Sequence, residues 1–89
     1  MKIKLELFGA SRDFSEKDFL EFNLKEKSSI KDLRQEILNF VDSNFKGNAN
    51  YKKLILSSTF CSEKNNIVSD NYKITKQQKI GIIPPIGGG

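Results

Sequence analysis

The chain has 89 residues, of which 37 % are hydrophobic and 29 % are charged, and its formal net charge is +4 at pH 7. This balance is typical of one small globular domain. It contains no histidine and a single cysteine, Cys61. These counts exclude Ser–His and Cys–His catalytic pairs, His-ligated or thiolate-rich metal sites and an internal disulfide. We therefore expect no metal site, no catalysis by this chain alone and a reducing, cytoplasmic setting.

The charge is unevenly distributed along the chain. Residues 1–44 carry eight basic and nine acidic side chains, whereas residues 45–89 carry seven lysines and two acids. A basic half of this kind is most often a solvated face, but it also suits an acidic or phosphorylated partner. No apolar run approaches the roughly 20 residues that cross a bilayer, so no membrane association is expected.

The first elements read as a hairpin. Residues 2–8 (KIKLELF) alternate apolar and charged positions, which predicts a half-buried strand with Phe8 on its polar side. Residues 9–18 read as a turn, and residues 19–24 (FLEFNL) alternate again. Two strands so close in sequence predict antiparallel pairing.

The period of the apolar residues then changes to three and four, which predicts an amphipathic helix. Ser29 is a suitable N-cap, and Asp32 follows at the spacing of a capping box. Gly47 is placed to end the helix. The recurring apolar residues are Ile30, Leu33, Ile37, Phe40 and Val41.

The second half is read as three further strands. Residues 51–60 (YKKLILSSTF) predict a strand centred on 54–56, and a long polar connection follows, with a short strand at 67–68. Residues 79–83 (KIGII) predict the last strand, which stops at Pro84 because proline has no N–H for the ladder.

This order of elements predicts an α+β domain with two layers, in which one main helix covers a mixed sheet of four to five strands. The first and last strands are expected to be central neighbours. The domain is predicted to span residues 1–83, and residues 84–89 are predicted to form an exposed C-terminal tail.

The tail sequence PPIGGG suggests a chemical role. Two prolines stiffen an extended segment, and glycine passes between close walls because it has no side chain. A terminal carboxylate becomes reactive once a partner enzyme adenylates it with ATP and magnesium. The activated carbonyl then accepts sulfur, giving a thiocarboxylate, or an amine, giving an isopeptide bond. The alternative is a frayed terminus without function.

These features together resemble the ubiquitin-like β-grasp sulfur carriers, and among them the small subunit of molybdopterin synthase. The ending IIPPIGGG, the segment LFGASRDF after the first strand and the helix start SIKDLRQEI carry the resemblance. The chain departs from the family at Ser57, where an asparagine is usual, and at 76–79, where an acidic turn with glycine is usual. It also has a longer connection at 61–73 and a basic charge.

The resemblance implies a mechanism. A ubiquitin-activating-type enzyme, using ATP and magnesium, adenylates Gly89, and sulfur then converts it to a thiocarboxylate. The large subunit of molybdopterin synthase supplies the catalytic residues and passes the sulfur to cyclic pyranopterin monophosphate in molybdenum cofactor biosynthesis. The chain itself would bind no cofactor and act as the non-catalytic subunit of this sulfurtransferase. The residues implied in tail insertion are Pro84, Pro85, Ile86, Gly87 and Gly88.

The resemblance also implies a partner interface, formed by an apolar patch of Phe8, Phe60 and Ile83 with Arg12 paired to an acid of the partner. From the residues alone, Phe8 packed beneath a loop and a solvated Arg12 remain open. Cys61 is interpreted as a packing residue.

Three other functions remain as alternatives. The first is a sulfur carrier for thiamine or for tRNA thiolation, and the second is a protein modifier of the ubiquitin type. The third is a basic RNA-binding module that uses the second half of the chain. Only Tyr51 and Tyr72 would serve such a module as stacking residues, and we expect no nucleic-acid partner.

Overall fold

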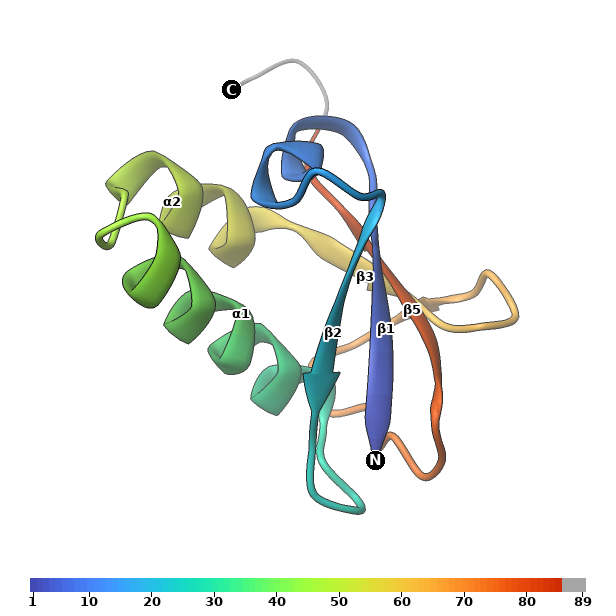
Figure 1. Ribbon diagram of the computed structural model, residues 1–89. Coiled ribbons are helices and arrows are strands. Elements are labelled where there is room, and N and C mark those ends of the chain that lie inside the picture. Colours follow the sequence, from blue (N-terminus) through green and yellow to red (C-terminus); the bar gives the residue numbers. More distant parts are fainter. Residues whose placement is uncertain (86–89) are drawn as a thin grey trace.

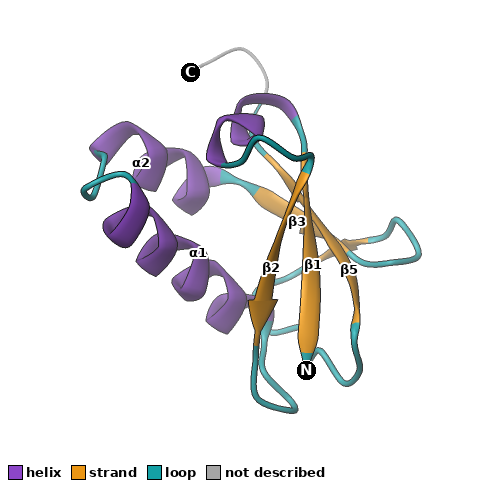
Figure 2. Ribbon diagram, in the orientation of Figure 1, coloured by secondary structure: helices purple, strands orange, loops and turns teal. Residues whose placement is uncertain are grey.

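The computed structural model describes residues 1–85 of the chain. A five-stranded mixed sheet in the order β2-β1-β5-β3-β4 is covered on one face by two helices (Figures 1 and 2). The elements are β1 (Lys2–Leu7), a 3-10 helix (Gly9–Phe14), β2 (Phe19–Asn23), α1 (Ile30–Asn44), α2 (Ala49–Ser57), β3 (Thr59–Cys61), β4 (Ile67–Val68) and β5 (Gln78–Ile83).

Strands β1 and β5 are neighbours inside the sheet, as predicted, and β5 is the central strand. Strand β1 pairs antiparallel with β2 and parallel with β5, where Leu5 lies opposite Ile80 and Leu7 opposite Ile82. The predicted hairpin and the predicted neighbourhood of first and last strands are both confirmed. Because β1 and β5 run parallel, both strands end at the same edge of the sheet.

Helix α1 begins and ends as the sequence predicts. The Asp32 N–H donates to Ser29 Oγ at 3.3 Å, and the Ser29 N–H donates to the Asp32 carboxylate at 2.8 Å, which completes a capping box. The Ser29 hydroxyl also donates to the Asp32 carboxylate, at 3.1 Å. The bonds from the Ser29 N–H and hydroxyl favour the ionised carboxylate and lower the pKa of Asp32. At the other end, Gly47 has a φ of +68° and donates its N–H to Val41 O at 3.2 Å.

The strand predicted at 51–60 is wrong over most of its length, because helix α2 occupies Ala49–Ser57. Only the last two residues of the predicted strand, 59–60, belong to β3. The side chain of Asn48 accepts the Tyr51 N–H at 3.1 Å and caps this helix. Tyr51, Leu54 and Ile55 then pack on the core at helical spacing. The predicted turn at 9–18 likewise contains the 3-10 helix, which buries Ser11 and Phe14.

One continuous core lies between the helices and the sheet. The core face of the sheet and the inner faces of both helices supply its side chains. Within residues 1–85, no helix lies on the other face of the sheet (Figure 2). The fully buried large side chains are Ile3, Leu5, Leu7, Ile30, Leu33, Ile37, Val41, Ile55, Phe60, Ile74, Ile80 and Ile82. We call the uncovered side the open face.

The long connection before β5 runs past the start of α1. The Ile30 N–H donates to Tyr72 O at 3.0 Å, and the Ile74 N–H donates to Ser28 O at 2.7 Å, while the Ile74 side chain is fully buried. This connection is polar in sequence, yet it contributes one residue to the core. Within residues 1–85, no helix is both long and apolar enough to cross a membrane.

Candidate functional site

The candidate site is the edge of the sheet where β1 and β5 end together. Pro84, which follows β5, is buried, whereas Pro85 is exposed. A Cβ built on Gly9 would lie 3.9 Å from the ring of Pro84, so the start of the 3-10 helix packs against this proline. The predicted exposed tail thus has its first residue packed into the domain. Ile86 and Gly87, Gly88 and Gly89, the other tail residues of the prediction, lie outside the described residues.

Phe8 lies on the open face, directly over Gly81 of β5. A Cβ built on Gly81 would lie 3.0 Å from Phe8 Cε2 and 2.8 Å from Cys61 Sγ. Only glycine allows the Phe8 ring to approach the strand this closely. The Phe8 side chain packs on a strand instead of beneath a loop, and it remains 36 % exposed.

Two further residues complete an apolar surface beside the end of β5. Ile83 is half-buried and lies opposite Thr59, whose hydroxyl donates to Ile83 O at 3.4 Å. Cys61, a free and half-buried thiol, lies opposite Gly81. We call Phe8, Cys61, Gly81 and Ile83 the exit patch, because the chain leaves the sheet beside it.

The predicted place of Phe60 in this patch is wrong. Its side chain is fully buried on the core face, opposite Ile82 and Val68 in the sheet. Side chains alternate along a strand, so the core position of Phe60 places its neighbour Cys61 on the open face. The Arg34 guanidinium lies 4.8 Å from the centre of the Phe60 ring and covers it further.

Charged groups surround the exit patch without forming a strongly charged site. Arg12 is exposed on the 3-10 helix and makes no ion pair with a described residue. Lys79 bonds to Glu6 across β5 and β1 at 3.0 Å. This bond raises the pKa of Lys79, because it stabilises the ammonium form. Pairing of Arg12 with an acid of a partner stays a prediction.

Two residues of the exit patch, Gly81 and the outward-facing Cys61, are absent from the predicted interface. For Gly81 a signal existed, since a glycine inside a strand often marks a close approach of another group. For Cys61 the prediction that Phe60 faces outward is the cause, because alternation along a strand then turns Cys61 toward the core. Within the part of the chain that the structure describes, no group of three or more His, Cys, Asp or Glu side chains is arranged to hold a metal ion.

The fold is shared with solved structures of ubiquitin-like proteins. A putative molybdopterin converting factor subunit 1 from Pyrococcus furiosus superposes with a TM-score of 0.69 at 20 % sequence identity, covering 96 % of this chain and 98 % of that one. SAMP1 from Haloferax volcanii gives 0.70 at 11 % identity, with both chains fully covered. Ubiquitin from Caldiarchaeum subterraneum gives 0.62 at 17 % identity, covering 100 % of this chain and 98 % of that one.

No family model matches the sequence, and no curated protein matches it. At these identities the likeness concerns the architecture alone. The chain therefore has the predicted ubiquitin-like β-grasp fold, with a second helix that the prediction lacked.

Proposed function

We propose that this chain is a ubiquitin-like sulfur carrier that serves molybdopterin synthesis. One observation carries the proposal: β5 leads the chain out beside an apolar patch, with Pro84 packed against Gly9, directly before the sequence PIGGG. This arrangement fixes the starting point of a thin segment next to a surface on which a partner can dock. A tail with this sequence suits delivery of a carboxylate into a narrow active site.

In the proposed reaction, the Gly89 carboxylate attacks the α-phosphate of ATP on a ubiquitin-activating-type enzyme and releases pyrophosphate. Persulfide sulfur from a donor then displaces AMP and forms an acyl disulfide. A second thiol of the donor attacks this S–S bond, which releases the thiocarboxylate and leaves the donor as a disulfide. The large subunit of molybdopterin synthase accepts the loaded tail, and the sulfur passes to cyclic pyranopterin monophosphate. Two loaded chains are required per product, because the dithiolene contains two sulfurs. This chain's own residues position the tail, and its partners supply ATP, magnesium and catalytic groups.

The test is intact-protein mass spectrometry of the full chain. The chain is incubated with ATP, magnesium, an activating enzyme and a persulfide donor, and then with the large subunit and the pterin precursor. We expect a mass gain equal to the exchange of one oxygen for sulfur, and its loss when the precursor is added. A chain that is never loaded contradicts the carrier function. A chain that is loaded but never discharged by the precursor contradicts the molybdopterin assignment only.

A second candidate is a protein modifier, which the shared fold with ubiquitin favours. The same adenylate would then meet a lysine amine and form an isopeptide bond. Affinity purification of the tagged chain from cells distinguishes the two. Higher-mass conjugates that resist reduction support the modifier, and a thiocarboxylate without conjugates supports the carrier.

The exit patch is the proposed partner interface, and Phe8→Ala tests it. Loss of a central, partly exposed aromatic at an interface typically costs 2 kcal/mol or more, so affinity for the large subunit is expected to fall about 30-fold. The free energy of unfolding should fall by less than the free energy of binding, because the ring is 36 % exposed before a partner docks. Calorimetric titration measures the affinity. Leu56→Ala, an exposed apolar residue on α2, is the matched control. Equal effects of both variants would remove Phe8 from the interface.

A further inference from the structure

The outer edge of β2 presents unpaired backbone groups. The Leu24 N–H donates to Met1 O at 2.8 Å, and the Leu7 N–H donates to Asp18 O at 2.9 Å. Hydrogen-bonded positions alternate along an antiparallel pair, so the even-numbered residues of β2 bond to β1. The N–H and C=O groups of the odd-numbered residues point away from β1, and no described residue pairs with them. These residues are Phe19, Glu21 and Asn23.

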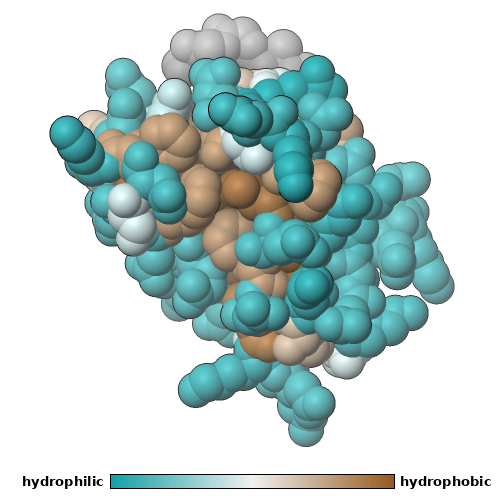
Figure 3. All heavy atoms as spheres, viewed as in Figure 1, coloured by the Kyte–Doolittle hydropathy of each residue, from teal (hydrophilic) through white to brown (hydrophobic). Residues whose placement is uncertain are grey.

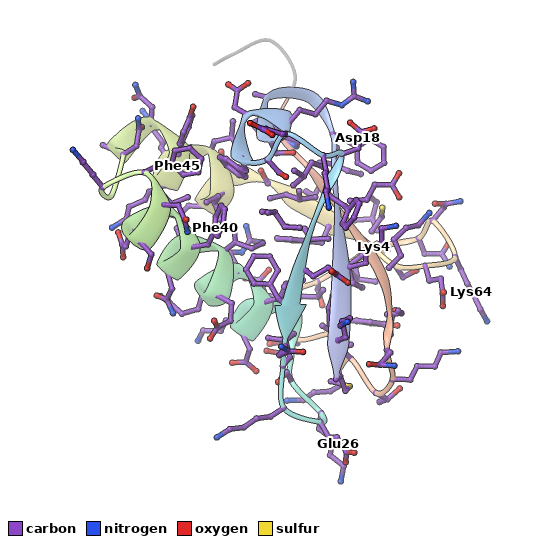
Figure 4. The ribbon with its side chains drawn as sticks, in the orientation of Figure 1. Lys4, Asp18, Glu26, Phe40, Phe45 and Lys64 are labelled. Atoms are coloured by element: carbon purple, nitrogen blue, oxygen red, sulfur yellow. The ribbon has the colours of Figure 1, made fainter. Side chains whose placement is uncertain are left out.

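An apolar strip of surface runs beside this edge, between β2 and α1. Leu20 and Phe22 face the helices but are only half-buried, and Phe40 of α1 is half-buried as well. The rings of Phe22 and Phe40 meet edge to face, with centroids 6.2 Å apart. Figure 3 shows apolar surface along the seam between the helices and β2, and Figure 4 places Phe40 on the helical side of that seam.

A shallow hollow of about 430 Å³ also lies along the first half of the edge. It reaches from the loop before β2 onto the strand itself. Its lining residues are Ser15, Glu16, Lys17, Phe19, Leu20 and Glu21. The edge therefore has free hydrogen-bonding groups, adjacent apolar surface and space for side chains.

The strand has few of the features that protect sheet edges in other proteins. Such edges carry proline, bulges or several charges, whereas β2 reads FLEFN, with Glu21 as its one charge. A symmetric antiparallel pairing of two copies that uses all three outward residues would place one Glu21 directly opposite the other. Like charges opposite each other destabilise a strand pair. Glu21 therefore disfavours a second copy of this chain as the occupant.

We propose that the outer edge of β2 binds an extended segment of a partner protein, which joins the sheet as a sixth strand. The register fixes the chemistry of that segment. Its residues beside Leu20 and Phe22 lie over the apolar strip and are apolar. Its residue opposite Glu21 lies on the open face and is lysine or arginine. Among the described residues, the exposed Glu21 carboxylate has a single ion pair, a long one of 3.9 Å with Lys2.

This surface is separate from the exit patch, because β1 lies between β2 and β5 in the sheet. A segment bound at β2 would leave the end of β5 free. A partner could therefore hold the domain while another protein acts on the tail. The inference rests on the geometry of β2 and stands whether or not the proposed sulfur chemistry is correct.

The experiment uses the full ¹⁵N-labelled chain and the capped peptide Ser-Thr-Val-Lys-Val-Thr-Ser. In NMR titration we expect the amides of Phe19, Glu21 and Asn23 to shift and to become protected from exchange. The amides of Leu20 and Phe22 are bonded to β1 already and should stay protected throughout. The same peptide N-methylated at its lysine lacks the central donor and should not bind.

The variant Glu21→Lys tests the charge preference. It should reverse the order of affinities, so that a Val-Glu-Val peptide binds about 3- to 10-fold better than the Val-Lys-Val peptide. Glu63→Lys, the same exchange at an exposed position between β3 and β4, is the control and should leave the original preference unchanged. Unchanged preference in Glu21→Lys would overturn the predicted chemistry of the segment.

Three outcomes would overturn the site itself. The first is the absence of any shift at millimolar peptide. The second is a set of shifts confined to the exit patch, which would mean that the peptide prefers that surface. The third is concentration-dependent protection of the Glu21 amide without peptide, which would assign the edge to a second copy of the chain.

Discussion

Replacing Arg34 by alanine is expected to lower the free energy of unfolding by about 3 kcal/mol. Arg34 Nη1 donates to Ile55 O at 2.6 Å and to Ser58 O at 2.9 Å, and Nη2 bonds to Asp70 at 2.7 Å. The side chain is only 14 % exposed and lies across the Phe60 ring. One guanidinium therefore joins α1, the end of α2 and the connection before β5.

The size of this effect follows from the carbonyls that would lose a charged donor. The last carbonyls of a helix lack their α-helical partner. The Ile55 carbonyl near the end of α2 accepts the Ser58 N–H at 3.3 Å, and Arg34 adds a shorter bond from a charged donor at 2.6 Å. Hydrogen bonds from a charged donor contribute about 1.5–3 kcal/mol each. Neighbouring bonds to one side chain are not additive, so the total stays near the value of two such bonds.

Urea and thermal unfolding measure the loss, with an expected decrease in Tm of roughly 15 °C. Asp70→Asn is the control, because it removes only the half-exposed partner of the ion pair and should cost less than about 1 kcal/mol. If Arg34→Ala and Asp70→Asn destabilise equally, the carbonyl contacts contribute nothing. If neither variant destabilises the domain, Arg34 does not stabilise the contact between α1, α2 and the connection before β5.

Much of the fold was readable from local patterns. The hairpin followed from strict alternation in residues 2–8 and 19–24, and α1 followed from its apolar spacing and its capping box at Ser29. In these segments, local preference and tertiary packing agree. The position of β5 beside β1 also followed, because an apolar run that ends at proline suits an internal strand with a defined end.

Helix α2 escaped prediction because its apolar residues are contiguous. Leu54, Ile55 and Leu56 form a run that fits a buried strand as well as a helix. Only packing in the folded domain decides between strand and helix here. Ile55 is fully buried, whereas Leu56 is 63 % exposed. Asn48 is a local signal for the start of a helix, but asparagine is also common in loops, so the signal is ambiguous.

The candidate site was predictable in its location but not in its full composition. Phe8 stood out because an aromatic residue closed the polar side of a strand, and it does lie on the open face. Phe60 was assigned through resemblance to a motif, and the structure buries it beneath Arg34. The role of Gly81 depends on two neighbours from other strands, Phe8 and Cys61, which no single-strand pattern reveals.

Truncation of the tail is expected to have the largest functional effect. Removing Gly88 and Gly89 should abolish thiocarboxylate formation while leaving Tm unchanged, because the lost residues carry no side chains to bury. Each residue extends a chain by about 3.3–3.6 Å, so the truncated carboxylate would stop about 7 Å short. Reacting atoms must approach within about 3–3.5 Å, and a deficit of this size prevents adenylation.

Deleting Gly89 alone tests whether the length of the tail or its terminal Gly-Gly sequence decides loading. This variant still ends in two glycines, but its carboxylate stops about 3.5 Å short, so we expect a severe loss of loading if reach decides. Intact mass spectrometry measures loading, and calorimetric titration with the large subunit reports docking. Docking should survive both truncations, since the exit patch remains, and this separates tail chemistry from surface recognition. Normal loading of the doubly truncated chain would contradict the assignment of Gly89 as the activated residue.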